Sequence, residues 1–191
     1  MATLQPPATL PLGTEAPDFS LPDPDGTTWT RDQLAGPHGL LVAFVCNHCP
    51  YVRHVAPTLA EAAARWTDAG VGVVGINSND STRYPEDAPD QMAEHARHWG
   101  WDFPYVVDGE QTAALAYRAA CTPDFFLFDG DRRLVYRGRL DGATPGNDVP
   151  VTGDELDAAV SAMLAGEAVS VDQRPSVGCS IKWKPGNEPG W

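Results

Sequence analysis

A continuous apolar run that passes directly into a helical pattern is the feature that most constrains how this chain can fold. The run Gly39–Val45 shows no polar alternation, which is typical of a central strand buried on both faces. From about residue 48 to residue 69 the spacing becomes helical and rich in alanine, and Gly70 provides the stop. A second buried run follows at Val71–Asn77. This order of strand, helix and strand predicts parallel strands in a sheet covered by helices on both faces.

The rest of the chain predicts shorter elements around this unit. Residues 16–30 contain two extended runs around Asp25-Gly26, which favours a hairpin. We expect Pro57 to kink the long helix, because proline removes an internal hydrogen bond. Further along we expect a helix that runs from an Asp87 N-cap and Pro89 to Trp99. A strand near 103–107, a helix near 109–119 and two hairpin strands at Phe125–Phe128 and Leu134–Arg139 should follow. The last expected helix starts at a Thr152–Glu155 capping box and ends before Gly166. The late hairpin adds an antiparallel pair, so the fold class is α/β with a central mixed sheet.

Length and composition favour one domain with a segment on each side. The 191 residues, of which 42% are hydrophobic, suffice for one full core and are too few for two. We expect an N-terminal arm at residues 1–12, a domain at 13–166, and a tail at 167–191 that packs Trp183 on the domain. The N-terminal residues lack the basic and apolar regions of a secretory signal, and no apolar stretch is long enough to span a bilayer. We therefore expect a cytoplasmic protein.

Charge and cysteine content narrow the range of functions. The chain has 13 Lys and Arg against 26 Asp and Glu, a net charge of -13. Such a surface repels phosphate backbones and anionic lipid, so nucleic acid and membranes are poor partners. The acidic stretch at residues 80–90 is interpreted as a solvated loop that could rim a substrate groove. In a reducing cytosol, four cysteines favour catalysis or metal binding over a disulfide framework.

The chemistry is predicted at Cys46-Asn47-His48-Cys49, where the buried strand passes into the helix. A helix N-terminus has free N–H groups and the positive end of the helix dipole, which stabilise a thiolate. Two intervening residues allow the sulfurs of Cys46 and Cys49 to meet at disulfide distance. A thiolate is the attacking species, so this placement predicts a redox-active dithiol.

The residue between the cysteines and the other two thiols leave alternatives open. A histidine beside a thiolate stabilises the reduced anion, so His48 predicts a reduction potential above the value of about −270 mV known for thioredoxin. The alternative is that His48 points into solvent.

Zinc sites use the same cysteine spacing, but no second CxxC or histidine pair accompanies it. Cys121 is either a buried small hydrophobe or a reserve thiol that exchanges with Cys49 or pairs with Cys179.

Several stretches of the chain carry a family resemblance, namely APDFSL, DPDGTTW, FVCNHCPYV, GINSND, YPEDAPDQM, CTPDFFLFD, LVYRGRLD and GCSIKWKPGNEP. Together they resemble the AhpC/TSA (peroxiredoxin-related) family of thioredoxin-like proteins, in particular its bacterial thiol–disulfide isomerase branch. The resemblance implies a thioredoxin-like fold with an N-terminal β-hairpin extension. It also implies Cys46 as the attacking thiol, Cys49 as the resolving thiol, and Thr122 with a cis Pro123 beside the substrate.

Two departures from the related families affect the chemistry that we expect. Peroxiredoxins have a threonine three residues before the reactive cysteine, and here that position is Ala43, which argues against efficient peroxidase activity. Thioredoxins bury an aspartate on the preceding strand as a proton acceptor, and Leu40–Val45 contains no acid. His48 is therefore the candidate acceptor for the proton of Cys49.

The expected function is thiol–disulfide exchange with protein or small-molecule disulfides and dithiols, supplied by an unidentified electron donor and without a cofactor. Two alternatives remain. One is a thiol peroxidase in which peroxide oxidises Cys46 and Cys49 resolves the product. The other is a metal-binding or redox-sensing module without turnover.

Overall fold

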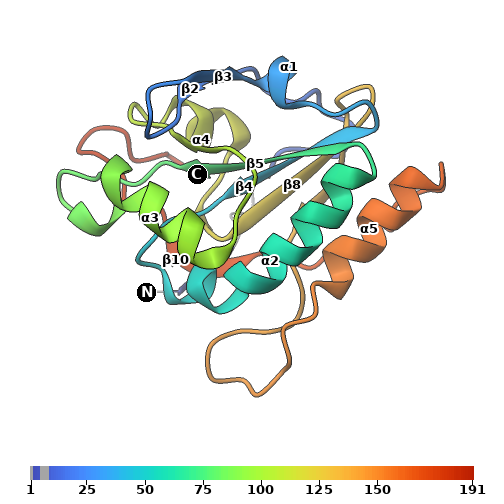
Figure 1. Cartoon of the computed structure of the whole chain (residues 1–191). Helices are drawn as coiled ribbons and strands as arrows, with labels where there is room; N and C mark the ends of the chain where they lie inside the picture. The colour runs from blue at the N-terminus through green and yellow to red at the C-terminus, as the bar shows by residue number, and fades with distance from the viewer. Residues whose placement is uncertain (1, 5–8) are drawn as a thin grey trace.

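The computed structural model of the chain describes residues 2–4 and 9–191, of which 2–4 are described as backbone only. At its centre lies a mixed sheet (Figure 1) whose strands, across the sheet, are β6 (Tyr105–Val107), β5 (Val71–Asn77), β4 (Gly39–Phe44), β8 (Asp124–Asp129) and β9 (Leu134–Gly138). β5 and β6 are parallel, whereas β4, β8 and β9 pair antiparallel. β4 and β5 lie side by side, and the Val45 N–H donates to the Ile76 carbonyl at 3.0 Å.

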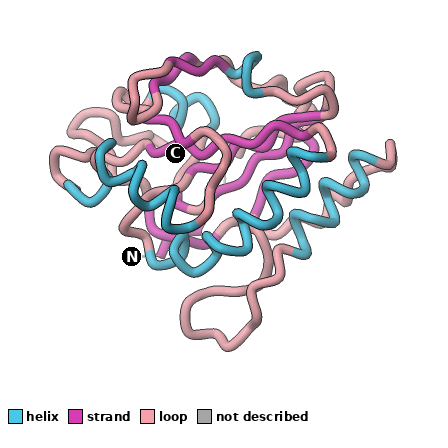
Figure 2. The backbone as a smooth tube through the Cα atoms, in the orientation of Figure 1, coloured by secondary structure: helices cyan, strands magenta, loops and turns pink. Residues whose placement is uncertain are grey.

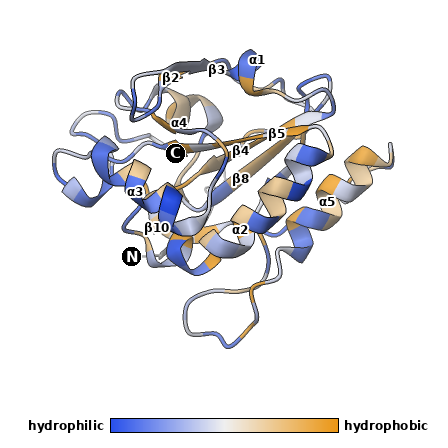
Figure 3. Ribbon diagram, viewed as in Figure 1, coloured by the Kyte–Doolittle hydropathy of each residue, from blue (hydrophilic) through white to orange (hydrophobic). Residues whose placement is uncertain are grey.

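Each face of this sheet carries its own layer and its own hydrophobic core. One face is covered by α2 (Pro50–Asp68), α3 (Pro89–Trp99) and α5 (Asp154–Leu164). The other face is covered by α1 (Arg31–Leu34), α4 (Thr112–Tyr117) and the hairpin of β2 (Ser20–Pro22) and β3 (Thr28–Thr30). Figure 3 shows the hydrophobic colour concentrated on the strands between the two layers.

The position of β4 between two cores explains its apolar sequence. Leu41 and Ala43 belong to the core under α2, whereas Leu40, Val42 and Phe44 belong to the opposite one. Successive side chains of a strand point to opposite faces, so a strand covered on both sides has no position for a polar residue. The mixed sheet between two covering layers confirms the expected α/β class, the mixed sheet and the thioredoxin-like fold.

A second, small sheet ties both ends of the chain to the domain. It consists of β1 (Ala2–Leu4), β10 (Val177–Ser180) and β7 (Cys121–Thr122), all antiparallel. Residues 1 and 5–8 of the expected N-terminal arm lie outside the described residues. In the tail, Ile181 is buried and Trp183 packs against the core above β4. The expected domain boundaries themselves stay a prediction.

Most expected elements are present within a few residues, and two helix starts differ. Asp87 is not the N-cap of α3; it ends a short 3-10 turn, η1 (Pro85–Asp87), and Ala88 takes the cap position before Pro89. The reason is that the Asp87 carboxylate is turned into the protein.

Pro57 lies within α2 as expected, and the kink there stays a prediction. Among the described residues, no helix combines the length and the apolar character that a membrane crossing requires.

The predicted capping box of α5 does not form. Gly153 is the N-cap, with a left-handed φ of 72°, and it has no side chain that could accept a helix N–H. The N–H groups of Thr152 and Gly153 instead donate to the buried carboxylate of Asp141, at 2.8 and 2.7 Å. Glu155 pairs with Arg139 rather than with the helix backbone. This helix follows a long loop after β9, drawn in pink in Figure 2.

Candidate dithiol active site

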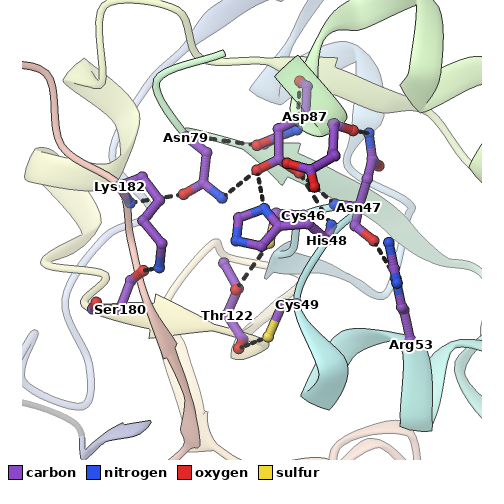
Figure 4. Close-up of polar contacts among 12 residues, drawn as sticks. Cys46, Asn47, His48, Cys49, Arg53, Asn79, Asp87, Thr122, Ser180 and Lys182 are labelled. Carbon is purple, nitrogen blue, oxygen red and sulfur yellow. Dashed lines mark hydrogen bonds and ion pairs between the residues drawn. The ribbon is translucent and has the colours of Figure 1, made fainter. Parts of the chain in front are cut away.

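Cys46 and Cys49 lie at the junction that the sequence predicts, between β4 and α2. Cys49 is the N-cap of α2, so the helix begins at Pro50, two residues later than expected. Both cysteines are fully buried, with an exposed fraction of 0%, and both are free thiols. The sulfurs share one neighbour, Thr122 (Figure 4): Cys46 Sγ lies 3.3 Å from its hydroxyl oxygen, and Cys49 Sγ lies 3.1 Å from its carbonyl oxygen. The Thr122–Pro123 peptide bond is cis, as the resemblance implies.

Beside this pair lies a buried carboxylate that the sequence reasoning missed. Asp87 accepts the backbone N–H groups of Asn47 at 2.8 Å and His48 at 3.3 Å on one oxygen. Its other oxygen accepts His48 Nδ1 at 2.6 Å and Asn79 Nδ2 at 2.7 Å. The interpretation of residues 80–90 as a solvated loop is therefore wrong at Asp87 and also at Asp80, which is buried. The one sequence signal of this carboxylate was an aspartate two residues before Pro89, a pattern that an ordinary helix N-cap also shows.

His48 is held by this carboxylate rather than pointing into solvent. Its ring stacks on Tyr84, with centroids 5.6 Å apart and planes 10° apart, and 19% of its side chain is exposed. The hydrogen bond to Asp87 raises the pKa of His48. Burial alone would raise the pKa of Asp87, but the hydrogen bonds from His48 and Asn79 outweigh it and leave that pKa lowered. The contact therefore stabilises the charged form of each side chain, a protonated His48 and an ionised Asp87.

The two sulfurs share one proton near neutral pH. The hydrogen bond with Cys46 lowers the pKa of Cys49 to about 5, while burial raises the pKa of Cys46, so the reduced pair carries a single negative charge. The remaining proton can pass between the two sulfurs along their hydrogen bond, and Thr122 stabilises the state in which Cys46 is the thiolate. Its carbonyl oxygen can only accept, which favours a proton on Cys49, and its hydroxyl can then donate to a Cys46 thiolate.

The other two thiols occupy different surroundings. Cys121 is buried, points at the Pro123 carbonyl 3.8 Å away, and lies opposite Ser180 in the β7–β10 pair. Cys179 lies opposite Thr122 in the same pair, and its thiol is within hydrogen-bonding reach of Cys49. Residues directly opposite share a face, so Cys121 and Cys179 point to opposite faces and are not placed to pair.

The tail completes the surroundings of the dithiol. The Lys182 N–H donates to Asn79 Oδ1 at 2.8 Å, and the Asp80 N–H donates to the Lys182 carbonyl at 2.8 Å. The ammonium group of Lys182 donates to the Ser180 carbonyl at 2.6 Å and lies 5.7 Å from the centre of the Tyr84 ring. Figure 4 shows this chain of contacts running from the tail through Asn79 to Asp87 and His48.

A group of possible metal ligands lies at the same place. Atoms of Cys46, His48 and Asp87 lie within 4.8 Å of one another. Each Asp87 oxygen already accepts two hydrogen bonds, so a metal ion bound to Asp87 would have to displace at least one of these donors. This group is the structural basis of the metal-binding alternative.

Two solved structures resemble this chain over almost its whole length. One is an uncharacterised conserved protein from Geobacillus kaustophilus, 45% identical, with a TM-score of 0.93 and 97% of each chain covered. The other is a hypothetical protein from Sinorhizobium meliloti 1021, 47% identical, with a TM-score of 0.91, covering 93% of this chain and 97% of that one. Neither carries a functional description in its name.

Two further comparisons connect the chain to redox proteins. The sequence model of the AhpC/TSA family matches residues 12–137, which include both cysteines of the dithiol and the cis-proline. The thiol-disulfide oxidoreductase ResA of Bacillus subtilis (strain 168) is 26% identical over 125 residues. That match spans 64% of this chain and 64% of ResA.

Proposed function

The chain belongs to the AhpC/TSA family, and we propose that within this family it is a thiol–disulfide oxidoreductase whose working groups are Cys46 and Cys49. The observation that carries the proposal is that both sulfurs lie against Thr122 at a helix start, where the hydrogen bond with Cys46 lowers the pKa of Cys49. The name of ResA supports the same class of reaction. No cofactor is needed for this chemistry.

The proposed reaction has two steps. The Cys46 thiolate attacks one sulfur of a substrate disulfide, forms a mixed disulfide and releases the other substrate sulfur as a thiolate. Cys49 then gives its proton to that thiolate and attacks Cys46, which forms the Cys46–Cys49 disulfide and releases the second substrate sulfur. One thiol and one thiolate leave, two electrons pass to the substrate, and the reverse sequence oxidises a dithiol.

His48 takes a different part from the one expected. Because the hydrogen bond to Asp87 raises the pKa of His48, the imidazole binds its proton more tightly than a free histidine does and is a poor acceptor for the proton of Cys49. Its positive charge instead favours the thiolate state of the reduced pair. Thr122 and Pro123 border the sulfurs and form the proposed contact with the substrate.

The proposed substrates and partners are protein or small-molecule disulfides and dithiols, together with an electron donor still to be identified. We keep the cytoplasmic location as part of the proposal. Fractionation of native cells with an antibody against the chain would test the location, and recovery outside the cytoplasm would contradict it.

The activity is tested by reduction of an insulin disulfide with a chemical dithiol as electron donor. We expect turnover by the native chain, none by Cys46→Ser, and native turnover by Cys121→Ser, whose thiol does not contact the pair. Incubation of Cys49→Ser with a disulfide substrate should trap a mixed disulfide on Cys46. Equal turnover by the native chain and Cys46→Ser would refute the proposal.

A thiol peroxidase is the second candidate, and one contact favours it. The Thr122 hydroxyl lies 3.3 Å from Cys46 Sγ, so a threonine from another segment supplies the hydroxyl that Ala43 lacks. Stopped-flow reaction of the reduced chain with hydrogen peroxide separates the two activities. A rate constant no greater than that of a free thiol excludes the peroxidase.

A further inference from the structure

The C-terminal strand β10 occupies the backbone edge beside the dithiol. β10 pairs antiparallel with β7, and this register places Cys179 opposite Thr122. At Gly178 the two strands approach so closely that an added Cβ would lie 2.0 Å from the Thr122 carbonyl oxygen. Only glycine fits such an approach without moving the backbone.

The occupied edge is the one that an extended substrate would use. A peptide that adds to a strand edge is held by main-chain hydrogen bonds, and its alternate side chains face the site. Here the chain's own tail holds that place, and β1 pairs with the outer edge of β10. Cys179 therefore lies where the cysteine of a bound substrate would lie, on the same face as Thr122.

We propose that Cys179 is a third redox-active thiol, which exchanges with the Cys46–Cys49 disulfide to give a Cys49–Cys179 disulfide. The inference rests on the function proposed above. In this step the Cys179 sulfur attacks Cys49 Sγ, the bond between Cys46 and Cys49 breaks, and the proton lost by Cys179 passes to the released Cys46 thiolate. One disulfide replaces another, so no external oxidant or reductant is needed.

The redox state of the dithiol controls when this exchange can occur. In the reduced chain, burial and the nearby Cys49 sulfur raise the pKa of Cys179 to about 12, which keeps it protonated. Formation of the Cys46–Cys49 disulfide removes the negative charge that the two sulfurs share and the hydrogen bond between Cys49 and Cys179, while the ammonium group of Lys182 continues to favour the Cys179 thiolate. Oxidation of the dithiol therefore activates the third thiol.

The exchange would close the site covalently. Cys46 and Cys49 are already fully buried with the tail in place. A bond from Cys49 to Cys179 fastens β10 across the dithiol and leaves Cys46 as a free but covered thiol. The reverse attack by Cys46 restores the original disulfide, so the oxidised protein exists as two isomers that differ in access to the site.

Peptide mapping distinguishes these isomers because of where the basic residues lie. Cleavage after Arg and Lys leaves both cysteines of the dithiol on one peptide, 32–53, whereas Cys179 lies on peptide 140–182, since Arg174 precedes a proline. A Cys46–Cys49 disulfide is thus a loop within one peptide, and a Cys49–Cys179 disulfide joins two. The oxidised chain is blocked with an alkylating agent in acid, digested without reductant and analysed by mass spectrometry.

We expect both the looped peptide and the joined pair from the native chain, and the same pattern from the control Cys121→Ser. Cys46→Ser oxidised with glutathione disulfide should give the joined pair alone, because Cys49 then has only Cys179 as a partner. If the native chain gives the looped peptide without the joined pair, and Cys46→Ser also gives no joined pair, the inference is overturned and the proposed function stays intact. Absence of every disulfide at Cys49 would overturn both.

A matched pair of glycine variants tests the role of strand pairing. Gly178→Val places a side chain against the Thr122 carbonyl, whereas Gly190→Val makes the same change in the same tail where no atom lies within 4 Å. Gly178→Val should lower the yield of the joined pair several-fold and raise the alkylation rate of the reduced dithiol several-fold. Gly190→Val should behave as the native chain. Equal yields from both variants would contradict the role assigned to β10.

Discussion

His48 Nδ1 donates to Asp87 Oδ2 at 2.6 Å, although 39 positions separate the two residues. The same carboxylate accepts the backbone N–H groups of Asn47 and His48, so it holds the segment between the cysteines by both its main chain and a side chain. The dithiol is thus supported from η1, an element that carries no cysteine. The charge of this carboxylate governs the titration of His48.

Replacing Asp87 with asparagine should lower the pKa of His48. The carboxylate is the main cause of the raised value, and an amide offers no charge and one acceptor fewer. We expect the pKa to fall to about 6.5 or below, as measured by the NMR titration of the imidazole protons. Glu86→Gln is the control, because it removes a neighbouring exposed charge whose side chain does not contact His48. Equal shifts in both variants would show that the contact is unimportant.

The free energy of unfolding should depend on pH through His48. A group whose pKa is raised on folding contributes stability that is fully present below its unfolded pKa of about 6.5 and is lost as pH rises through the folded pKa. Urea unfolding of the native chain and His48→Gln between about pH 5 and pH 9 measures this contribution. The difference between them should be largest at acid pH and shrink toward alkaline pH. A difference that grows with pH would reverse the assignment.

The reduction potential of the Cys46–Cys49 pair should lie above about −270 mV, the value for thioredoxin. The protonated His48 favours the reduced, anionic dithiol, and favouring the reduced form raises the potential. His48→Gln should therefore lower the potential, as measured by equilibration with glutathione buffers. His54→Gln is the control, since this exposed histidine lies on α2 and does not contact the dithiol. A native value near or below that of thioredoxin would contradict the role of His48.

Replacing Cys46 with alanine should raise the pKa of Cys49. The hydrogen bond from Cys46 is the main cause of the lowered value of about 5, and burial opposes it. Without that partner we expect a pKa at or above about 8.5, the ordinary value of a thiol. The pH dependence of the alkylation rate of the reduced protein measures it, with Cys121→Ala as the control. An unchanged midpoint in Cys46→Ala would show that another group stabilises the thiolate.

A buried ion pair behind the cis-proline should dominate local stability. Arg137 Nη2 lies 3.2 Å from Asp124 Oδ2, with 3% and 0% of the side chains exposed, and Ser176 of the tail also donates to Asp124. Arg137→Leu leaves the Asp124 carboxyl buried without its partner, which costs about 3–5 kcal/mol in free energy of unfolding. Arg174→Leu, which removes the exposed pair with Asp172, should cost less than about 1 kcal/mol. Urea unfolding compares the two variants, and similar losses would contradict this assignment.

The sequence predicted well those features that depend on neighbouring residues. The apolar run of β4, the helix after it and the late hairpin follow from side-chain periodicity, which is local. The dithiol spacing and its place between strand and helix are local as well. Helix starts were less certain, because Asp87 and Thr152 carry the residue types of a cap while the structure uses Ala88 and Gly153.

The sequence alone therefore determined the fold class, the position of the two neighbouring cysteines and the proline beside them, because each depends on periodicity or on a short motif. Only the tertiary structure decided that Asp87 lies behind His48, that Thr122 contacts both sulfurs, and that the tail brings Cys179 to Cys49. These contacts join segments that are far apart along the chain, and the charge on each sulfur depends on burial and on partners from those segments. No local pattern encodes such a contact, because a pKa is set by the surroundings that folding creates.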